Sequence, residues 1–232
     1  MTAFLPSAVA RNRFHRRLLG WYSRHRRDLP WRRTRDPYRV LVSEVMLQQT
    51  QVERVIPKYR EFLRRYPTFG RLARASPAEV RRVWYPLGYN IRPVHLHGIA
   101  RETMARYAGR LPDDAAALRG MRGIGRYTAG AILAFAYGRE AAIVDTNVRR
   151  VLGRVFLGPK RLARLRGQKV MWELAESLLP PGRVYDYNQA LMDFGAIWCT
   201  ARAPRCRPCP MKGFCASYPL YGTANGRGDG RA

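Results

Sequence analysis

Four cysteines carry the most specific chemistry in this sequence. Cys199, Cys206, Cys209 and Cys215 are the only cysteines among 232 residues, and their spacing is Cys-x6-Cys-x2-Cys-x5-Cys. Four thiolates in one short span can hold a [4Fe-4S] cluster or a tetrahedral zinc ion, since both prefer soft sulfur ligands. A pair of disulfides is the alternative, but disulfides suit secreted chains and nothing in the sequence looks secreted. We therefore expect a metal centre.

Two carboxylates stand where they could act as an acid and as a charge stabiliser. Glu44 lies in an apolar run over residues 40–47, where desolvation should raise its pKa and hold a proton near neutral pH. Taken alone, Glu44 is more simply interpreted as the partner of one of the many arginines. Asp145 precedes a helix with an apolar face and is expected to cap it. A carboxylate fixed in this way can also stabilise developing positive charge.

A pair of glycines marks a candidate phosphate site. Gly123, Ile124 and Gly125 come just before an expected helix over residues 127–137, with Arg126 between. Glycines let backbone N–H groups approach a ligand, and a helix N-terminus adds the positive end of its dipole. A plain turn between two helices would explain the same pair, so Gly-x-Gly by itself is a weak signal.

Net charge points to a polyanionic partner. The chain has 43 lysines and arginines against 16 aspartates and glutamates, a formal net charge of +27, which exceeds what solubility requires. Neutralising phosphates releases condensed counterions, so such a chain gains nucleic-acid affinity without reading a base sequence. The alternative, a merely basic soluble protein, is disfavoured because arginines recur along most of the chain.

The elements that position these residues are expected to be helices. Apolar residues recur at three- and four-residue spacing, sustained strand alternation is absent, and proline-containing breaks cut the chain into helix-sized pieces. The sequence therefore predicts an all-α fold. It shows no membrane span, and we expect a frayed end over residues 1–10 and a flexible glycine-rich tail over residues 216–232.

Several motifs together resemble one family. Residues 118–130 look like the hairpin of the helix-hairpin-helix DNA glycosylases, the superfamily of endonuclease III and MutY, with Arg122 in place of the usual proline. Residues 144–148 resemble the segment with the catalytic aspartate, and the cysteine spacing is the one the family uses for its [4Fe-4S] cluster. The similarity runs over about residues 27–215 and makes zinc a minor alternative.

The resemblance implies a two-lobed helix-hairpin-helix DNA glycosylase fold with a [4Fe-4S] cluster loop. Residues 1–30 with 138–215 would form the cluster lobe, and residues 31–137 a six-helix barrel with its hairpin at 118–138. DNA would lie between the lobes. The implied partner is double-stranded DNA with a mispaired or damaged base, bound by a monomer in the cytoplasm with the nucleoid and without a membrane.

Site residues are assigned by the same resemblance. The run over residues 43–51 is strongly similar to the MutY active-site segment, which endonuclease III relatives lack. Glu44 would then protonate adenine, and Asp145, with Asn147 nearby, would stabilise the sugar cation. The implied substrate-binding residues are Trp31, Arg32, Leu47, Gln48, Gln49, Thr50, Tyr89 and Gln189, and the implied DNA-backbone contacts are Gly123, Ile124, Gly125 and Arg126. Among them, Gln49 and Tyr89 match residues that enter the duplex, and the Gln189 amide suits a purine edge.

Position 127 separates two reaction types. Bifunctional members have a lysine there, whose amine attacks the sugar and leads to strand cleavage. Tyr127 cannot form that Schiff base, so the resemblance implies a monofunctional enzyme in which Tyr127 helps to orient the site. A helix-facing aromatic without a catalytic role is the alternative for this residue.

The resulting expectation is removal of adenine from mispairs with guanine or 8-oxoguanine. A thymine or uracil mismatch glycosylase is the alternative, since those enzymes share the compact form and a tyrosine at position 127. A noncatalytic, cluster-containing DNA-binding protein is the second alternative. Typical MutY proteins continue into a MutT-like domain and have Tyr-Tyr-Ser-Arg at residues 89–92, so we expect weak preference for the base opposite adenine.

Overall fold

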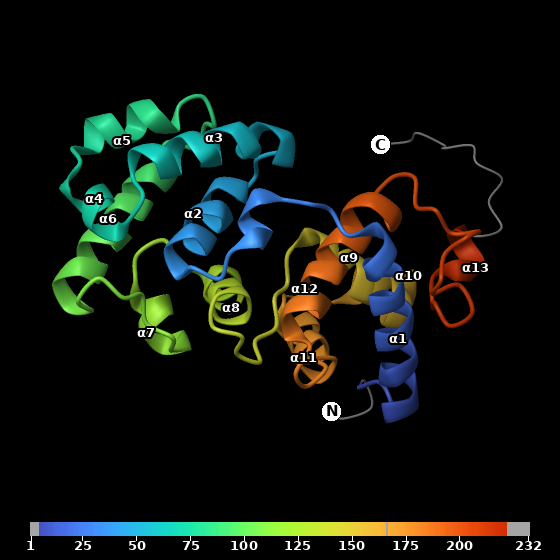
Figure 1. The fold of residues 1–232 in the computed structure, drawn as a ribbon. Helices are drawn as coiled ribbons and strands as arrows, with labels where there is room; N and C mark the ends of the chain where they lie inside the picture. The colour runs from blue at the N-terminus through green and yellow to red at the C-terminus, as the bar shows by residue number, and fades with distance from the viewer. Residues whose placement is uncertain (1–4, 166, 222–232) are drawn as a thin grey trace. The chain divides into compact units, whose positions relative to one another are not determined.

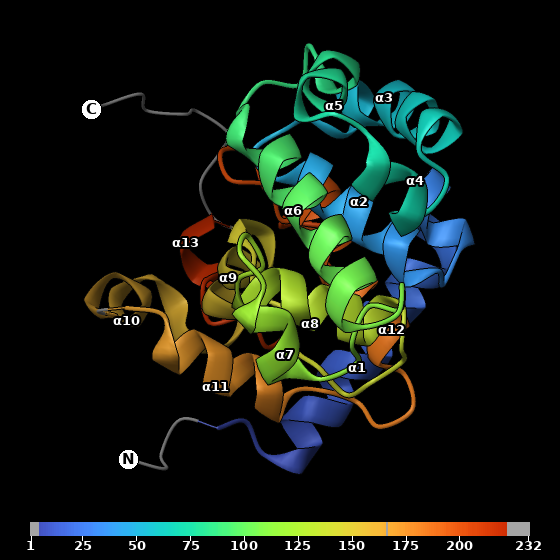
Figure 2. The ribbon, with the colours of Figure 1, turned by 90° about the vertical axis from the view of Figure 1, so that its left-hand side faces the viewer.

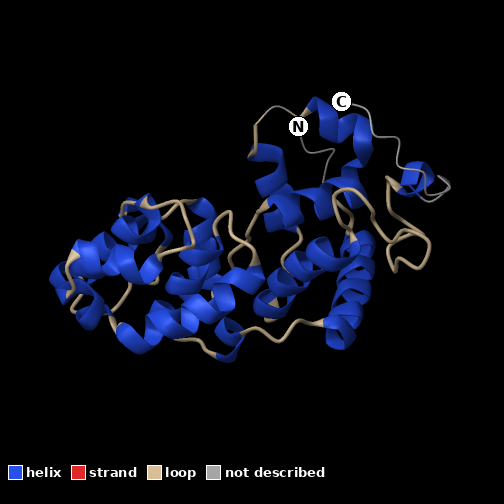
Figure 3. Cartoon of the chain, turned by 90° about the horizontal axis from the view of Figure 1, so that it is seen from above, coloured by secondary structure: helices blue, strands red, loops and turns tan. Residues whose placement is uncertain are grey.

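A computed structural model describes residues 5–165 and 167–221, and over these residues the chain is helical, without a strand (Figure 3). The all-α fold predicted from the sequence is thus confirmed. The chain divides into two compact units: Asp28–Arg139, and Met1–Arg27 together with Glu140–Ala232. Residues 222–232, most of the tail expected to be flexible, lie outside the described residues, as do residues 1–4. In the part of the chain that the structure describes, no helix is long and apolar enough to cross a membrane.

The unit Asp28–Arg139 is built around a buried helix, α2 (Figures 1 and 2). Its elements are a 3-10 turn at Pro30–Arg33, α2 (Pro37–Leu47), α3 (Val52–Arg65), α4 (Phe69–Arg74), α5 (Pro77–Trp84), α6 (Ile91–Arg106), α7 (Ala115–Gly120) and α8 (Arg126–Phe135). Helix α2 packs against α3, α6 and α8, and α6 also packs against α4 and α5. This packing accounts for the nearly continuous apolar sequence of α2, which has no solvent-facing stripe.

Local signals in the sequence fix where these helices begin. Asp36 caps α2 by accepting a hydrogen bond from the backbone N–H of Tyr38 at 2.8 Å, and Pro37 occupies the first helical position. Ser76 and Glu79 form a reciprocal capping box at the start of α5. The start of α2 is therefore set by its own sequence.

The second unit joins the first helix to the C-terminal part of the chain. Its elements are α1 (Ala8–His25), α9 (Thr146–Leu152), a π-helical turn at Gly153–Leu157, α10 (Gly158–Arg164), α11 (Lys169–Ser177), α12 (Val184–Asp193), a second π-helical turn at Phe194–Trp198, and α13 (Tyr218–Tyr221). Helix α1 packs on α12. The fully buried Phe14 and Leu18 lie on this face of α1, and the Phe14 ring meets Tyr187 of α12 edge-on.

An ion pair fastens the end of the N-terminal segment to α12. Arg27 Nε donates to Asp193 Oδ1 at 2.6 Å, and the Arg27 backbone N–H donates to Oδ2 at 3.1 Å. Asp193 is fully buried. Because a buried carboxylate is costly unless it is paired and hydrogen-bonded, this contact fixes the chain where it leaves the unit.

Candidate active site

Glu44 lies in the buried part of α2 with only 4% of its surface exposed. Its chain neighbours Ser43 and Val45 are equally buried, and the Ser43 hydroxyl donates back to the Val40 carbonyl oxygen at 2.8 Å. The burial expected for Glu44 from its apolar surroundings is confirmed. A carboxyl group in such a setting is suited to general acid chemistry.

The chain turns sharply where α2 ends, and this turn presents Gln49. Leu47 is the last helical residue and is half-buried, as is Gln48, which follows it. Gln49 is exposed and has a φ of 54°, in the left-handed region that favours glycine. Thr50 closes the turn through its N–H, which donates to the Leu47 carbonyl at 3.3 Å, and through its hydroxyl, which donates to the Gln48 carbonyl at 3.2 Å.

Tyr89 occupies a second turn of the same kind, just before α6. It is 57% exposed and has a φ of 48°. A left-handed conformation costs a non-glycine residue about 1–3 kcal/mol and persists only when the surroundings impose it. Gln49 and Tyr89, the two residues expected to enter a duplex, thus both sit on strained, exposed turns of one unit.

The Gly-x-Gly hairpin joins α7 to α8. Gly123 has a φ of 100°, and a Cβ there would lie 2.7 Å from the Cβ of His95 on α6, so only glycine fits. Ile124 is 5% exposed and anchors the hairpin. Gly125 is the N-cap of α8, where no side chain caps the helix and a Cβ would meet nothing within 4 Å. The exposed turn is open to close approach by a phosphate.

Residues at the start of α8 differ slightly from the expected helix over residues 127–137. The helix spans Arg126–Phe135, so Arg126 and Tyr127 both lie in its first turn. Arg126 is exposed, whereas Tyr127 is half-buried.

Trp31 and Arg32 belong to the 3-10 turn ahead of α2. The Trp31 ring is 6% exposed and meets Tyr59 of α3 edge-on, with ring centroids 5.5 Å apart. Packing in the core therefore accounts for Trp31. Arg32 is half-buried beside it.

Asp145 is the N-cap of α9, as its position in the sequence predicts. Oδ1 accepts a hydrogen bond from the Val148 backbone N–H at 2.7 Å, and Oδ2 accepts one from Asn147 Nδ2 at 3.0 Å. The carboxylate is half-buried. Both oxygens are engaged, so the group is held in one orientation, as a charge stabiliser needs to be.

Hydrogen bonds continue from Asn147 to the first cysteine. Asn147 Oδ1 accepts from Arg150 Nη2 at 2.7 Å, and Arg150 Nε donates to the Cys199 carbonyl oxygen at 2.8 Å. Arg150 Nη2 also donates to the Gly195 carbonyl at 2.7 Å. Gly195 is buried against Asn147, where an added Cβ would lie 2.6 Å from the Asn147 Cβ. Asp145 and the cysteine loop thus belong to one bonded arrangement.

The four cysteines line one small cavity. Arg154 bounds it, with Nη1 3.5 Å from Cys199 Sγ and donating to the Thr200 carbonyl at 2.6 Å. Burial raises the pKa of the Cys209 thiol to about 12, and it also raises the pKa of Cys206 and Cys215. Among the described residues no three His, Cys, Asp or Glu side chains are grouped closely enough for one metal ion. The cavity lining contains all four thiols and no carboxylate or imidazole, and its other polar lining atoms include the hydroxyl groups of Ser217 and Tyr218.

Gln189 lies on α12 in the same unit as Asp145 and is 4% exposed. Its neighbour Asn188 donates from Nδ2 to the Ala141 carbonyl oxygen at 2.9 Å. This bond ties α12 to the loop that leads into Asp145, so Gln189 and Asp145 are carried by connected elements.

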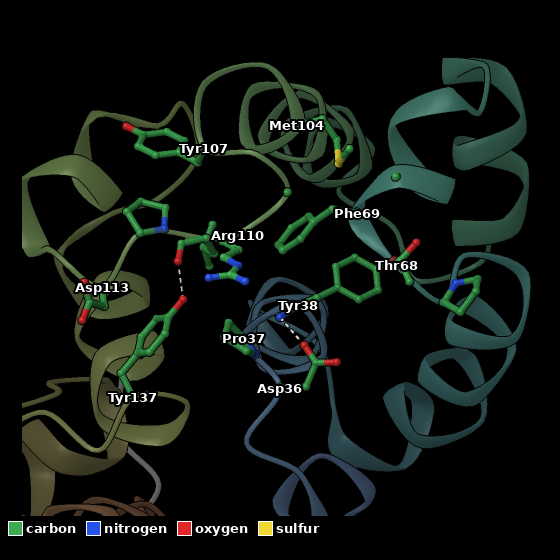
Figure 4. A pocket seen from close by; sticks show the side chains of 15 residues that line it. Asp36, Pro37, Tyr38, Thr68, Phe69, Met104, Tyr107, Arg110, Asp113 and Tyr137 are labelled. Atoms are coloured by element: carbon green, nitrogen blue, oxygen red, sulfur yellow. Dashed lines mark hydrogen bonds between the residues drawn. The ribbon is translucent and has the colours of Figure 1, made fainter.

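The predicted residues therefore fall into two groups. Glu44, Gln49, Tyr89 and the hairpin belong to Asp28–Arg139, whereas Asp145, Asn147, Gln189 and the cysteines belong to the other unit. A cavity of about 870 Å³ contains none of them. It opens at the N-terminal end of α2, where Figure 4 shows Tyr38, Phe69 and Arg110 around it.

Three residues in this arrangement were missed by reasoning from the sequence. Arg150 and Gly195 support Asn147, and Arg92 of α6 is 4% exposed and bonded to the turns of Gln49 and Tyr89. One feature of the sequence could have indicated Arg92, which is a cation between the apolar residues Ile91 and Pro93. The position of Arg150, three residues after Asn147, could have indicated their contact, because side chains at this spacing are neighbours on a helix.

The all-helical fold, the glycine hairpin and the two placed carboxylates define a helix-hairpin-helix DNA repair protein. The chain belongs to the HhH-GPD superfamily of base excision DNA repair proteins, whose family model matches residues 42–177.

Individual relatives agree with this assignment. The chain is 43% identical to the adenine DNA glycosylase of Homo sapiens over 87% of its own length and 39% of that protein, so it spans about two fifths of that relative. It is 37% identical to the thymine/uracil-DNA glycosylase of Methanothermobacter thermautotrophicus over 89% of its length and 93% of that protein. The structure of a thermostable thymine-DNA glycosylase matches with a TM-score of 0.85 and 37% identity, covering 90% of this chain and 96% of the other.

Proposed function

We propose that this protein is a monofunctional DNA glycosylase that removes adenine mispaired with guanine or 8-oxoguanine. The observation that carries the proposal is Glu44, a buried acid one turn before the exposed turn of Gln49. Adenine is a poor leaving group as an anion. Glu44 would protonate a ring nitrogen so that the base leaves neutral as its bond to the sugar breaks.

Asp145 would stabilise the positive charge that then develops on the sugar. Its two oxygens already accept hydrogen bonds from Val148 and Asn147, so little reorganisation accompanies the reaction. Water adds to the sugar carbon and its proton returns to the Glu44 carboxylate. The products are free adenine and an abasic site, and the enzyme regains its starting protonation state.

Access to the glycosidic bond requires extrusion of the adenine from the duplex. The exposed Gln49 and Tyr89 side chains would fill the space that it leaves, and the hairpin at Gly123–Gly125 would hold the backbone through N–H groups. Leu47, Gln48, Thr50, Arg32 and Gln189 would surround the base and its flank. The protein would act as a monomer, and its substrate would keep it with the nucleoid.

A [4Fe-4S] cluster would occupy the cysteine cavity. It would stabilise the loop whose Cys199 carbonyl oxygen accepts a hydrogen bond from Arg150 of α9. The gathering of all four thiols in a lining without a carboxylate or imidazole supports this choice. A single zinc ion needs four sulfurs at about 2.3 Å from one point, whereas each cluster thiolate binds a different iron and the sulfurs stand further apart.

Tyr127 favours hydrolysis without strand cleavage, because a phenol cannot form the Schiff base that a lysine forms. Borohydride should therefore trap no adduct between protein and DNA, and strand breaks should appear only after alkali or heat.

A thymine or uracil mismatch glycosylase is the second candidate. The relative of that name matches over nearly its whole length, at 93%. The run over residues 43–51 favours adenine, because it resembles the adenine enzymes.

Single-turnover excision separates the two candidates. Duplexes with A:8-oxoguanine, A:G, T:G and U:G are compared at one salt concentration, with Glu44→Gln as the inactive control. We expect excision from both adenine duplexes, with a weak preference between them. Processing of T:G or U:G with both adenine duplexes intact would replace the adenine proposal by the pyrimidine one.

A further inference from the structure

Arg92, the second residue of α6, bonds to both turns that present the candidate duplex-entering residues. It is 4% exposed. Its guanidinium donates to five backbone carbonyl oxygens: from Nη1 to Val45 at 3.2 Å, to Met46 at 2.9 Å and to Gln48, and from Nη2 to Leu87 and Gly88, each at 3.1 Å.

These acceptors form two separate sets. The three Nη1 acceptors end α2 and lead directly into Gln49, whereas the two Nη2 acceptors immediately precede Tyr89. One planar group therefore joins turns that are some forty residues apart in the sequence. The Arg92 guanidinium carbon also lies 5.3 Å from the centre of the Tyr89 ring, within the range of a cation–π contact.

Burying the charge of Arg92 costs free energy, and the shape of the guanidinium group accounts for an arginine at this position. No described carboxylate forms an ion pair with Arg92, and its charge is offset only by carbonyl dipoles and aromatic faces. A buried, unpaired charge is an expensive way to fill a core. The planar guanidinium of arginine, however, can donate hydrogen bonds in two directions at once.

The two turns also need an external support. Gln49 and Tyr89 both hold left-handed backbone conformations without being glycine, and such conformations persist only when neighbouring groups impose them. Arg92 bonds the carbonyl immediately before each of them.

We propose that Arg92 is a positioning residue that couples the Gln49 and Tyr89 turns, so that both side chains enter the duplex as one preformed unit. The part that concerns DNA rests on the function proposed above. The part that concerns the two turns does not, because it is a property of the free protein.

The first test compares Arg92→Lys with Arg101→Lys, an exposed arginine on the same helix. A lysine keeps the charge but cannot reach both sets of carbonyls. Hydrogen exchange is measured in the DNA-free protein over residues 47–51 and 87–91. We expect faster exchange in both segments together for Arg92→Lys and no change for Arg101→Lys.

The second test follows base extrusion and excision. 2-Aminopurine beside the mispair reports unstacking by its fluorescence, and single-turnover excision is measured at saturating enzyme. For Arg92→Lys we expect a smaller fluorescence rise and excision about tenfold or more slower, with duplex affinity changed less. Should the lysine variant not fold, Arg92→Met, which buries no charge, takes its place under the same measurements.

A double-mutant cycle decides whether Arg92 acts through the two turns. In a Gln49→Ala, Tyr89→Ala background, Arg92→Lys should cause no further loss of extrusion. An equal loss of extrusion in both backgrounds would overturn the proposal. So would a lower melting temperature of Arg92→Lys if hydrogen exchange and fluorescence, measured 20 °C below that temperature, are unchanged. If exchange in the free protein and fluorescence on a T:G duplex respond as expected while adenine is never excised, the coupling stands and the adenine assignment fails.

Discussion

Asn147 donates a hydrogen bond to Asp145 across a single turn of backbone, from Nδ2 to Oδ2 at 3.0 Å. Asn147 in turn accepts from Arg150 at 2.7 Å. The orientation of the carboxylate thus depends on an amide whose other end is fixed by a cation. This dependence makes the site sensitive to changes that leave Asp145 itself intact.

Replacing either carboxylate by its amide should abolish base release while preserving duplex binding. Glu44→Gln removes the proton donor, and Asp145→Asn removes the charge, although an asparagine still caps α9. We expect each variant to lose on the order of a hundredfold or more in single-turnover excision. Asp114→Asn, a cap at the start of α7, and Glu53→Gln, an exposed glutamate, are the matched controls. Near-normal excision by the Glu44 or the Asp145 variant would show that the replaced residue does not have its assigned role.

Gly195→Ala should impair excision without touching a catalytic group. Its Cβ would lie 2.6 Å from the Asn147 Cβ, so Asn147 must move and its bond to Asp145 must change. We expect slower excision and a loss of about 1–3 kcal/mol in stability from overpacking. The control is Gly20→Ala in α1, where a Cβ meets nothing within 4 Å. If Gly195→Ala is only less stable and excises at the wild-type rate, Asn147 does not orient Asp145.

The two hairpin glycines should respond differently to alanine. Gly123→Ala places a Cβ against His95 at a φ of 100°, so we expect a lower melting temperature. Gly125→Ala has room for its Cβ and loses only the preference of an N-cap for glycine over alanine, so its melting temperature should fall less than that of Gly123→Ala. It should still bind duplex DNA more weakly, because a methyl group stands where a phosphate would approach. Melting curves and duplex Kd values at fixed salt test this, and unchanged binding by Gly125→Ala would exclude the turn as a phosphate site.

Iron, and not zinc, should fill the cysteine cavity. Metal analysis after anaerobic purification should find about four irons per chain, as a [4Fe-4S] cluster requires. Cys206→Ser should lower stability or DNA binding more than it changes the rate of chemistry in bound complexes. Ala216→Ser, at an exposed position of the same loop, is the control. Stoichiometric zinc without iron would contradict the cluster assignment.

His15 should make the stability of the fold fall as pH drops below about 6.5, the ordinary pKa of a histidine. Burial lowers the pKa of His15 from 6.5, with Arg11 acting in the same direction and a hydrogen bond to the Leu178 carbonyl opposing it. The unfolded chain then binds a proton at higher pH than the folded one, so the contribution of His15 to stability is complete above pH 6.5 and is lost as pH falls from there through the lower pKa of the folded state. Urea unfolding across this range should show a flatter pH dependence for His15→Gln. An unchanged slope would contradict the assignment.

Features set by adjacent residues could be predicted from the sequence. The apolar run around Glu44 indicated a buried helix, and Asp145 before an apolar periodic segment indicated an N-cap. Both are present because a few neighbouring residues suffice to cause them. The helical fold was predictable for the same reason.

Features set by distant residues could not be predicted. Arg92 bonds carbonyls in two turns whose backbone conformation no local pattern specifies. The requirement for glycine at position 195 comes from Asn147, which lies nearly fifty residues earlier. Trp31 meets Tyr59 of α3 edge-on, and Tyr59 lies nearly thirty residues later in the sequence. In each case the cause is a tertiary contact that one segment does not encode.

The packing of α1 on α12 has a consequence for synthesis on the ribosome. Asp28–Arg139 is one continuous segment, so it can fold as soon as it has emerged. The unit that surrounds it in sequence cannot, because Phe14 and Leu18 are covered only after α12 has been made. A nascent chain therefore carries the apolar face of α1 uncovered until α12 has been made, and Asp193, which receives Arg27, is the last residue of α12.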